Sequence, residues 1–364
     1  MNKKIYISLI AGCLLSVVSF YFALRNVPFK ELVLYFKSIN YIWIIPSLLM
    51  MVLSYFLRAW RWQVILHHIS KLPFFAAFHP MMISFMINNI LPGRIGEFAR
   101  PAILKKQNKI SYTSGLTTLA VERLFDMIIL IILFVWVLSG VEIDPNHSIQ
   151  FNDYQLNKSV LDMIARGMAV FCAVLAAGIC LVSFSGIRKI IVKIIMKLPL
   201  LFPFFNDSQK EKVYTFCCKP LLSFIENIAS GVSLINNPLG ILTCTGLSIV
   251  IWTVQALSLY LFTFGCPGVS LTFCETTMVF IIICFFIALP SVPGFWGLWE
   301  AGGVFAMSLF GISQQNAIGF SLITHAITFF MVLVIGTISA AIIGVNIFKV
   351  SFNEEQLFDK RYSI

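Results

Sequence analysis

Long uninterrupted runs of apolar residues dominate this chain of 364 residues, and they constrain its fold more than any other feature. Several runs reach the length of about 20 residues that an α-helix needs to cross the hydrocarbon core of a bilayer. Charged residues make up 12% of the chain, whereas a soluble domain carries about 25%. The sequence therefore predicts an all-α polytopic membrane protein. A β-barrel would instead show alternating segments of about ten residues.

The apolar segments also set the expected domain organisation. They lie near residues 5–24, 41–57, 74–92, 115–139, 160–184, 239–264, 273–289, 302–311 and 317–348. We expect about six spanning helices, together with two re-entrant helical hairpins near residues 74–106 and 273–311. Residues 1–348 then form a single transmembrane domain, and residues 349–364 form a short cytoplasmic tail. The first run is too long for the apolar region of a signal peptide, so we expect a retained helix.

Lysine and arginine are concentrated at residues 94–110 and 186–220, whereas residues 140–159 are mainly acidic. Cytoplasmic loops of membrane proteins are enriched in Lys and Arg, so we place both basic blocks and both termini on the cytoplasmic side of the inner membrane. This orientation requires residues 74–92 to enter the membrane and turn back. In the alternative, residues 74–92 cross and the N-terminus is external, which leaves five other basic residues outside: Lys3, Lys4, Arg58, Arg61 and Lys71.

The formal net charge of +10 does not indicate nucleic-acid binding, because the basic residues flank apolar segments. Anionic lipid headgroups are the natural partners of such blocks. Within the cytoplasmic segment 186–220, Lys189, Lys193 and Lys197 recur every four residues among Ile and Val. This spacing predicts an amphipathic helix that lies in the membrane interface.

The first interrupted segment is "NNILPGRIGEFARPAILKK", residues 88–106. Its apolar run breaks at Pro92-Gly93, and a second glycine follows at Gly96. Irregular backbone at membrane depth is tolerated only where it is buried in protein or lines a water-filled cavity. The break therefore predicts a polar cavity inside the protein.

A second interrupted segment, "LPSVPGFWGLWEAG", occupies residues 289–302. Like the first, it places glycines and then a glutamate after a Leu-Pro pair; the matching residues are Pro290, Pro293, Gly294, Gly297 and Glu300. Two related hairpins that enter from opposite faces would form an inverted repeat, an arrangement that places transporter substrate sites near the membrane midplane. The alternative is that so short a similarity arose by chance.

Charged residues inside the apolar runs are the candidate binding residues. The sequence "ERLFD" places Glu122, Arg123 and Asp126 within one apolar segment, where each buried charge costs about 2.5–3.5 kcal/mol unless it is paired. Glu122 and Asp126 share a helix face, and Arg123 can reach Asp126. These charges either form a salt-bridge latch between helices or contact a substrate.

Arg94 and Arg100 follow the first break, where guanidinium groups and free backbone N–H groups could bind a lipid phosphate. Their alternative role is to set the topology. Glu300 is either a proton-coupling site, a partner for an arginine, or a solvated residue at the cavity mouth. Arg58 and Arg61 are expected at a cytoplasmic helix end, and His325 is expected to be a buried, hydrogen-bonded histidine. The predicted substrate-binding set is Asn88, Asn89, Arg94, Glu97, Arg100, Glu122, Arg123, Asp126 and Glu300.

With these motifs in place, the chain resembles the flippase-like membrane domain of lysylphosphatidylglycerol synthase/flippases and their stand-alone relatives. The resemblance rests on "RAWRW" at residues 58–62, the two interrupted segments and "ERLFD", in that order. The matching positions are Pro92, Gly93, Gly96, Glu97, Arg100, Glu122, Arg123, Asp126, Pro293, Gly294, Gly297 and Glu300. Phe295-Trp296 departs from the small residues usual there. The soluble aminoacyl-transferase domain of the bifunctional synthases is absent, so we do not expect lysyl-lipid synthesis.

The resemblance implies translocation of an anionic phospholipid or a polyprenyl-phosphate-linked lipid, with the headgroup bound in a polar intramembrane cavity. The sequence contains no nucleotide-binding, catalytic-triad or metal-ligand motif, so we expect no enzyme activity, cofactor or metal. The alternatives are an intramembrane transferase acting on a polyprenyl-phosphate lipid and a non-catalytic partner in an envelope-synthesis complex. The expected partner is a membrane lipid with a phosphate headgroup, and a homo-oligomer or an envelope-biosynthesis protein is a further candidate.

Overall fold

The computed structural model describes residues 28–67, 69–91, 94–140, 149–151, 154–156, 185–197, 238–288 and 293–345, and a few single positions outside these ranges. The regular secondary structure of these residues is helical, apart from two short antiparallel strands, β1 (Ile149–Phe151) and β2 (Tyr154–Leu156), in which Gln150 pairs with Gln155. The fold is therefore helical, as predicted. The expected first helix, most of the run 160–184 and the tail 349–364 lie outside the described residues.

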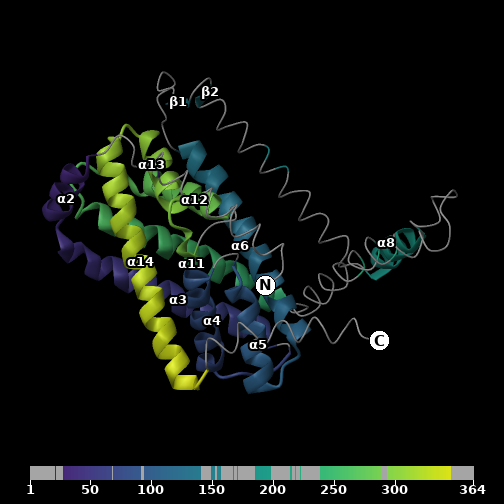
Figure 1. The fold of residues 1–364 in the computed structure, drawn as a ribbon. Coiled ribbons are helices and arrows are strands. Elements are labelled where there is room, and N and C mark those ends of the chain that lie inside the picture. Colours follow the sequence, from purple (N-terminus) through teal and green to yellow (C-terminus); the bar gives the residue numbers. More distant parts are fainter. Residues whose placement is uncertain are drawn as a thin grey trace.

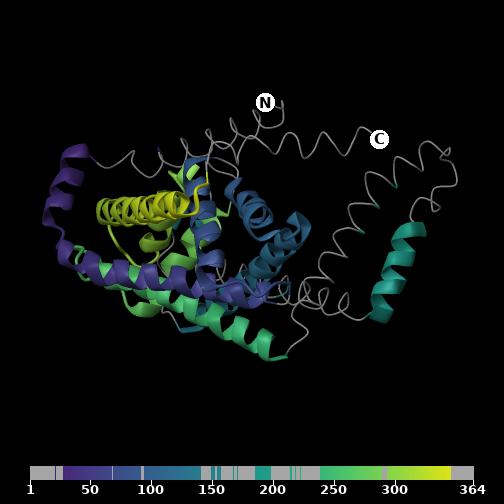
Figure 2. The ribbon, with the colours of Figure 1, turned by 90° about the horizontal axis from the view of Figure 1, so that it is seen from below.

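Within the described ranges, three helical stretches are long and apolar enough to cross a membrane: Tyr41–Leu66, Pro238–Thr263 and Gln314–Ile343. The first comprises η1 (Tyr41–Trp43) and α3 (Ile44–Leu66), and the others are α11 and α14. Helices α3 and α11 run side by side (Figure 2). They are antiparallel, because the Asn40 N–H donates to the Gly265 carbonyl at 2.8 Å, where one helix begins and the other ends.

Helix α6 (Tyr112–Gly140) has 29 residues and would be about 43 Å long at 1.5 Å per residue. It differs from the three spanning candidates because its middle carries the charges of "ERLFD".

Two further helices lie at the periphery of the structure. Helix α2 (Phe29–Ser38) packs against α14. Helix α8 (Ser185–Lys197) falls in the segment predicted to be amphipathic and exposes Ile190 and Ile194.

Four shorter helices form two broken pairs, one at each interrupted segment. Helices α4 (Phe74–Ile90) and α5 (Gly96–Asn108) contact each other, and so do α12 (Phe273–Ile287) and α13 (Leu298–Ser308), with η4 (Pro293–Phe295) between the latter two. In Figure 1 the first pair lies near the lower end of α14 and the second pair near its upper end.

Local sequence explains where several of these helices begin and end. Thr272 caps α12, because its side chain accepts from the Glu275 N–H while the Glu275 carboxylate accepts from the Thr272 N–H. Ser313 caps the start of α14, and Gly344 ends that helix in the left-handed conformation that glycine adopts without steric cost. These caps fix α12 and α14 at the edges of their apolar runs.

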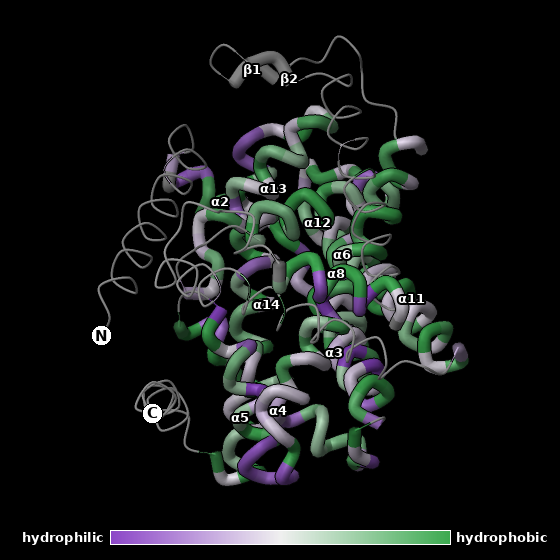
Figure 3. Tube along the Cα trace, turned by 90° about the vertical axis from the view of Figure 1, so that its right-hand side faces the viewer, coloured by the Kyte–Doolittle hydropathy of each residue, from purple (hydrophilic) through white to green (hydrophobic). Residues whose placement is uncertain are grey.

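Two hydrophobic clusters make up most of the core. One joins α12 and α13 to parts of α6, α11 and the first half of α14; the other joins α3, α4 and α5 to the second half of α14. Apolar residues cover most of the helical bundle, and hydrophilic residues occur in short stretches (Figure 3). The polar side chains described next lie where the two clusters meet.

Candidate functional site

Three helices bring charged side chains together in the interior. We call the group of Arg58, Arg61, Arg100, Glu122, Arg123 and Asp126 the central charge cluster; its members come from α3, α5 and α6. Five of the six residues are buried, and Arg123 keeps 35% of its side chain exposed. The cluster contains four arginines and two carboxylates. It therefore carries an excess of two positive charges.

Short contacts hold the buried part of this cluster. Arg61 Nη1 donates to Asp126 Oδ1, and Arg100 Nη1 donates to Glu122 Oε2, both at 2.7 Å. Arg61 Nη2 lies 3.4 Å from Glu122 Oε1, so one arginine of α3 bridges both carboxylates of α6. Because buried charges are tolerated when they are paired and hydrogen-bonded, these contacts explain how charge is accommodated among apolar helices.

Aromatic and polar neighbours complete this arrangement. The Trp252 indole N–H donates to Asp126 Oδ1 at 3.1 Å, and the Arg58 guanidinium lies 4.7 Å from the Trp252 ring centroid. Arg58 Nη2 also donates to Gln255 Oε1 at 2.7 Å. The Arg100 guanidinium lies over the Trp62 ring at 4.7 Å. Such cation–π contacts add stabilisation of about 2 kcal/mol where the groups are desolvated.

A cavity of about 210 Å³ opens beside the central charge cluster. Its wall contains residues from α3, α4, α5, α6, α11, α12, α13, α14 and both interrupted segments. The polar and charged members are Tyr55, Arg58, Asn88, Asn89, Arg94, Glu97, Arg123, Gln255, Cys284, His325 and Thr328. A water molecule needs about 10–15 Å³ of such cavity volume. The cavity therefore has room for several water molecules or a small charged group.

Arg94 connects the two interrupted segments across this cavity. Its Nη2 donates to the Ile287 carbonyl at 2.9 Å, where α12 ends, and its guanidinium lies 5.7 Å from the Phe295 ring centroid. Arg94 has a φ of 56° and Phe295 a φ of 63°, both in the left-handed region that non-glycine residues seldom occupy. Strained backbone of this kind is concentrated at functional sites. Each break therefore contributes a strained residue to the same wall.

The charged side chains that line the cavity are unbalanced. Among the described residues of the wall, Arg58, Arg94 and Arg123 are accompanied by one carboxylate, Glu97. The nearest contacts of Arg123 to carboxylate oxygens are 3.5 Å to Glu122, 3.8 Å to Asp126 and 3.9 Å to Glu97, all longer than a charge-assisted hydrogen bond. Among the described residues, the carboxylates thus hold Arg123 at 3.5 Å or more, and 35% of its side chain is exposed.

The second interrupted segment contains a different pair. Glu300 has a fully buried side chain, and its Oε1 lies 2.7 Å from His325 Nδ1. Its other oxygen accepts from the Gly297 N–H at 2.7 Å, where α13 begins. His325 Nε2 lies 2.7 Å from the Gly294 carbonyl. Glu300 is therefore not a solvated residue at a cavity mouth, which was one of the alternatives drawn from the sequence.

The structure places the predicted substrate-binding residues in three groups. Asn88, Asn89, Arg94, Glu97 and Arg123 line the cavity. Arg100, Glu122 and Asp126 are buried in the central charge cluster beside it, and Glu300 is buried against His325. The predicted turn residues Pro92, Gly93 and Pro290 lie outside the described residues, whereas Gly96, Pro293, Gly294 and Gly297 lie at the starts of α5 and α13 or in η4. Binding by any of these residues stays a prediction.

One expectation from the sequence is wrong. Arg58 and Arg61 do not mark a cytoplasmic helix end, because α3 continues to Leu66 and both side chains are buried against the carboxylates of α6. They therefore cannot be counted as loop charges that orient the chain.

Three residues of the site were missing from the predicted set: Gln255, Trp252 and His325. The isolated position of His325 in an apolar helix was the available signal for the last of these.

Among the described residues, no group of three or more His, Cys, Asp or Glu side chains is arranged to hold a metal ion. The donors of the site are instead guanidinium, amide and indole groups. Such donors bind anions, and arginine in particular matches the oxygen geometry of phosphate or carboxylate. These donors are chemically suited to an anion.

Comparison with known proteins places this arrangement in a family. The model of the lysylphosphatidylglycerol synthase TM region matches residues 9–336. The chain belongs to this family. The match covers both interrupted segments and the central charge cluster. Together with the apolar helices, it establishes a membrane protein of a lipid-related family, as the motifs of the sequence predicted.

Two named relatives are similar to the chain at low identity. The chain is 23% identical over 271 residues to a UPF0104 membrane protein of Methanocaldococcus jannaschii, which covers 74% of this chain and 99% of that protein. It is 23% identical over 383 residues to Glycosyltransferase AglD of Haloferax volcanii, which covers 98% of this chain and 58% of AglD. The chain thus spans little more than half the length of the second relative.

Proposed function

We propose that this protein binds the phosphate-bearing headgroup of an anionic lipid in the cavity and moves that headgroup across the inner membrane. The lipid is a phospholipid or a polyprenyl-phosphate-linked lipid. The observation that carries the proposal is Arg123, a cavity-lining arginine that has no carboxylate contact shorter than 3.5 Å among the described residues. Arg94 and Arg58 line the same cavity and add to its positive charge.

Electrostatics favour an anion over a neutral or cationic guest. In the described part of the wall, three arginines line the cavity with one glutamate. The buried Arg61 and Arg100 lie beside them, each held by a carboxylate of α6. Charge interactions are several times stronger at the low effective dielectric of a protein interior than in water. A phosphate group in the cavity would therefore offset part of the unbalanced positive charge.

The short helices support the re-entrant geometry that we propose for the two breaks. At 1.5 Å per residue, α4 is about 25 Å long and α12 about 22 Å, each less than the roughly 30 Å of the hydrocarbon core. Their partners α5 and α13 are shorter still. The two helices of each pair contact each other, so each pair would enter and leave the membrane by the same face.

The two pairs lie at opposite ends of α14 (Figure 1). We propose that the pair α4–α5 enters from the cytoplasmic face and the pair α12–α13 from the external face. The cavity between them would then open alternately to either side, as in transporters built from inverted repeats. The hydrogen bond from Arg94 to the end of α12 would have to break and reform as the cavity changes the side to which it opens.

A reconstituted transport assay tests this function. The purified full-length protein is placed in liposomes containing fluorescent phosphatidylglycerol, and the rate at which outer-leaflet probe becomes protected is measured. We expect transport by the wild type and a reduction of about tenfold or more in Arg123→Gln and Arg94→Ala, since each removes a charge-assisted contact worth about 1.5–3 kcal/mol. Lys106→Gln, an exposed position on α5, is the matched control for loss of one positive charge. Equal rates in all four proteins would refute the proposal.

A transferase is the second candidate, because one relative is named a glycosyltransferase. Glu97 is the single carboxylate among the described residues that line the cavity, and 27% of its side chain is exposed. It would be the base for such a reaction. A transferase forms product in detergent, where no compartments exist, and loses activity in Glu97→Gln. A translocase shows only lipid binding under the same conditions.

A further inference from the structure

The Glu300–His325 pair has more hydrogen-bond acceptors than a neutral histidine can serve. Both contacts of the imidazole are short: 2.7 Å to the Glu300 carboxyl group and 2.7 Å to the Gly294 carbonyl. A carbonyl oxygen only accepts, so Nε2 must carry a hydrogen. An ionised carboxylate also only accepts, so Nδ1 must carry a hydrogen as well unless the carboxyl group itself is protonated.

Either assignment gives the pair one proton more than a neutral imidazole and an ionised carboxylate hold together. When that proton leaves for water, one hydrogen is left to serve two acceptors, and one of the 2.7 Å contacts is lost. The contact to Gly294 joins α14 to η4, and Glu300 caps α13 through the Gly297 N–H. Proton loss would therefore loosen the second interrupted segment.

We propose that the Glu300–His325 pair is a proton-binding site whose occupancy is coupled to anion binding in the cavity. The proposal rests on the proposed function for the identity of the anion. The coupling is inferred from the position of the pair, because it lies next to the arginine-lined cavity. One proton is taken up from cavity water and returned to it, and no covalent bond changes.

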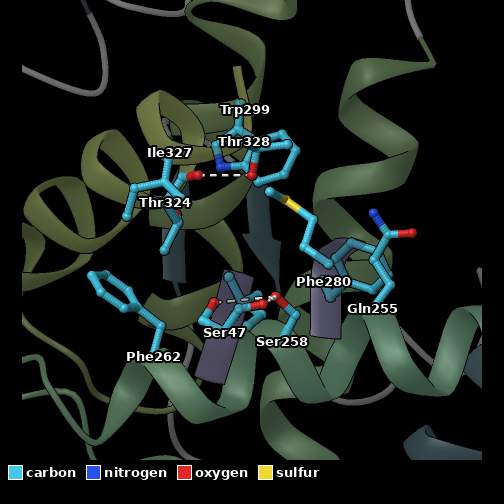
Figure 4. A pocket seen from close by; sticks show the side chains of 11 residues that line it. Ser47, Gln255, Ser258, Phe262, Phe280, Trp299, Thr324, Ile327 and Thr328 are labelled. Atoms are coloured by element: carbon cyan, nitrogen blue, oxygen red, sulfur yellow. Dashed lines mark hydrogen bonds between the residues drawn. The ribbon is translucent and has the colours of Figure 1, made fainter. Parts of the chain in front are cut away.

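The proton can reach this site through His325, because His325 lines the cavity while Glu300 is sealed behind it. A smaller pocket of about 30 Å³ lies next to the cavity and shares Gln255, Trp299 and Thr328 with its wall. This volume has room for about two water molecules. Figure 4 shows Ser47, Ser258, Thr324 and Thr328 around this pocket, with Ser47 and Ser258 joined by a hydrogen bond of 3.1 Å.

This small pocket lies toward the start of α3 and the end of α11, away from the central charge cluster. The indole Nε1 of Trp299 lines both spaces, is buried, and has no hydrogen-bond partner among the described residues. An unpaired buried donor together with four hydroxyl groups favours ordered water in this pocket. Water there would connect His325 to the other end of the bundle.

The surroundings of the pair explain the coupling. The titratable or charged groups that line the cavity together with His325 are Tyr55 and Arg58 of α3, Arg94, Glu97 of α5, Arg123 of α6 and Cys284 of α12. Their arginines oppose any extra proton in the cavity wall. An anion bound to these arginines would reduce that repulsion, so anion and proton would each favour the binding of the other, as thermodynamic linkage requires.

Two tryptophans provide a readout that is independent of transport. The ring centroid of Trp296 lies 4.3 Å from that of His325, and Trp299 stacks on His325 at 5.0 Å. Protonated imidazole quenches indole fluorescence, so tryptophan emission of the full-length protein in nanodiscs is measured from about pH 5 to 8, where histidines titrate. We expect a pH-dependent change in emission that is lost in His325→Gln and altered in Glu300→Gln. His79→Gln, in a helix that contributes other residues to the cavity, is the control and should retain the wild-type curve.

The anion arm of the experiment uses the wild type alone, so it does not depend on a variant that folds. Short-chain phosphatidylglycerol should move the midpoint to higher pH, and short-chain phosphatidylcholine should leave it in place. A pH-dependent change that persists in His325→Gln overturns the proton site, and so does a flat wild-type curve. A midpoint that phosphatidylglycerol does not move overturns the coupling. Failure of transport in liposomes with an intact titration would count against the proposed function alone.

Discussion

Arg100 donates a hydrogen bond of 2.7 Å to Glu122 across the contact between α5 and α6, and both side chains are buried. Glu122 also lies 3.4 Å from Arg61 and 3.5 Å from Arg123. One carboxylate thus interacts with arginines from three helices. The pairing links the helix after the first break to the rest of the bundle.

Glu122→Gln should destabilise the fold more than Arg100→Met. The first change removes the only carboxylate that contacts the buried Arg100 among the described residues and takes one carboxylate from Arg61 and Arg123, which keep Asp126. The second change leaves Glu122 with Arg61 and Arg123. Removing one partner of a buried ion pair costs about 3–5 kcal/mol. The measurement is the thermal unfolding of detergent-solubilised protein. The double variant should be less destabilised than the sum of the two changes, and a Glu122→Gln melting temperature equal to that of Arg100→Met would contradict the arrangement.

Gly96→Ala should disrupt the contact between α4 and α5. A Cβ atom at Gly96 would overlap the Ser84 carbonyl oxygen and approach the Asn88 side chain, so the two helices would have to separate. Overpacking of this kind costs about 1–3 kcal/mol. Gly246→Ala in α11 is the control, because no atom lies within 4 Å of its added Cβ, and alanine favours a helix by about 1 kcal/mol. Melting temperatures should move in opposite directions, and a neutral Gly96→Ala would show that the helices are not closely packed.

Lys109→Gly should stabilise the end of α5. Lys109 ends this helix with a φ of 56°, a conformation that glycine adopts without steric cost. The gain is about 1 kcal/mol, the steric cost of this conformation in a residue with a Cβ atom. Lys106→Gly removes the same charge within the helix and should destabilise by about 1 kcal/mol. Thermal unfolding of the two variants distinguishes them, and equal loss in both would argue against the left-handed cap.

Much of the fold could be predicted from apolar run length alone. The runs 74–92, 239–264 and 273–289 correspond to α4, α11 and α12 within two residues at each end. A helix in an apolar environment must satisfy its backbone hydrogen bonds internally, so run length and helix length agree closely. Spans outside the described residues, the re-entry of the hairpins and the orientation in the membrane remain predictions.

The site was harder to predict, because its contacts join residues far apart in sequence. Arg61 was assigned to a helix end, since its partner Asp126 is 65 residues away and nothing in the local pattern indicates the pairing. The partner of Glu300 is His325, 25 residues away on another helix. Local charge spacing identifies which residues need a partner. Only the packing of helices determines which partner each one finds.

Gln255→Glu should weaken the binding of anionic lipid while preserving the fold. Gln255 Oε1 accepts from Arg58 Nη2 at 2.7 Å in the cavity wall, and a glutamate at this position can keep that contact as an ion pair. The substitution lowers the excess of positive charge along the wall from two to one. At an effective dielectric of about 20, one added charge several ångströms from a phosphate changes affinity by about tenfold or more. Gln255→Met has a similar volume and no charge, so it should have a smaller effect. Binding of short-chain phosphatidylglycerol, followed by tryptophan fluorescence, measures both, and unchanged affinity in Gln255→Glu would show that anions do not bind at this wall.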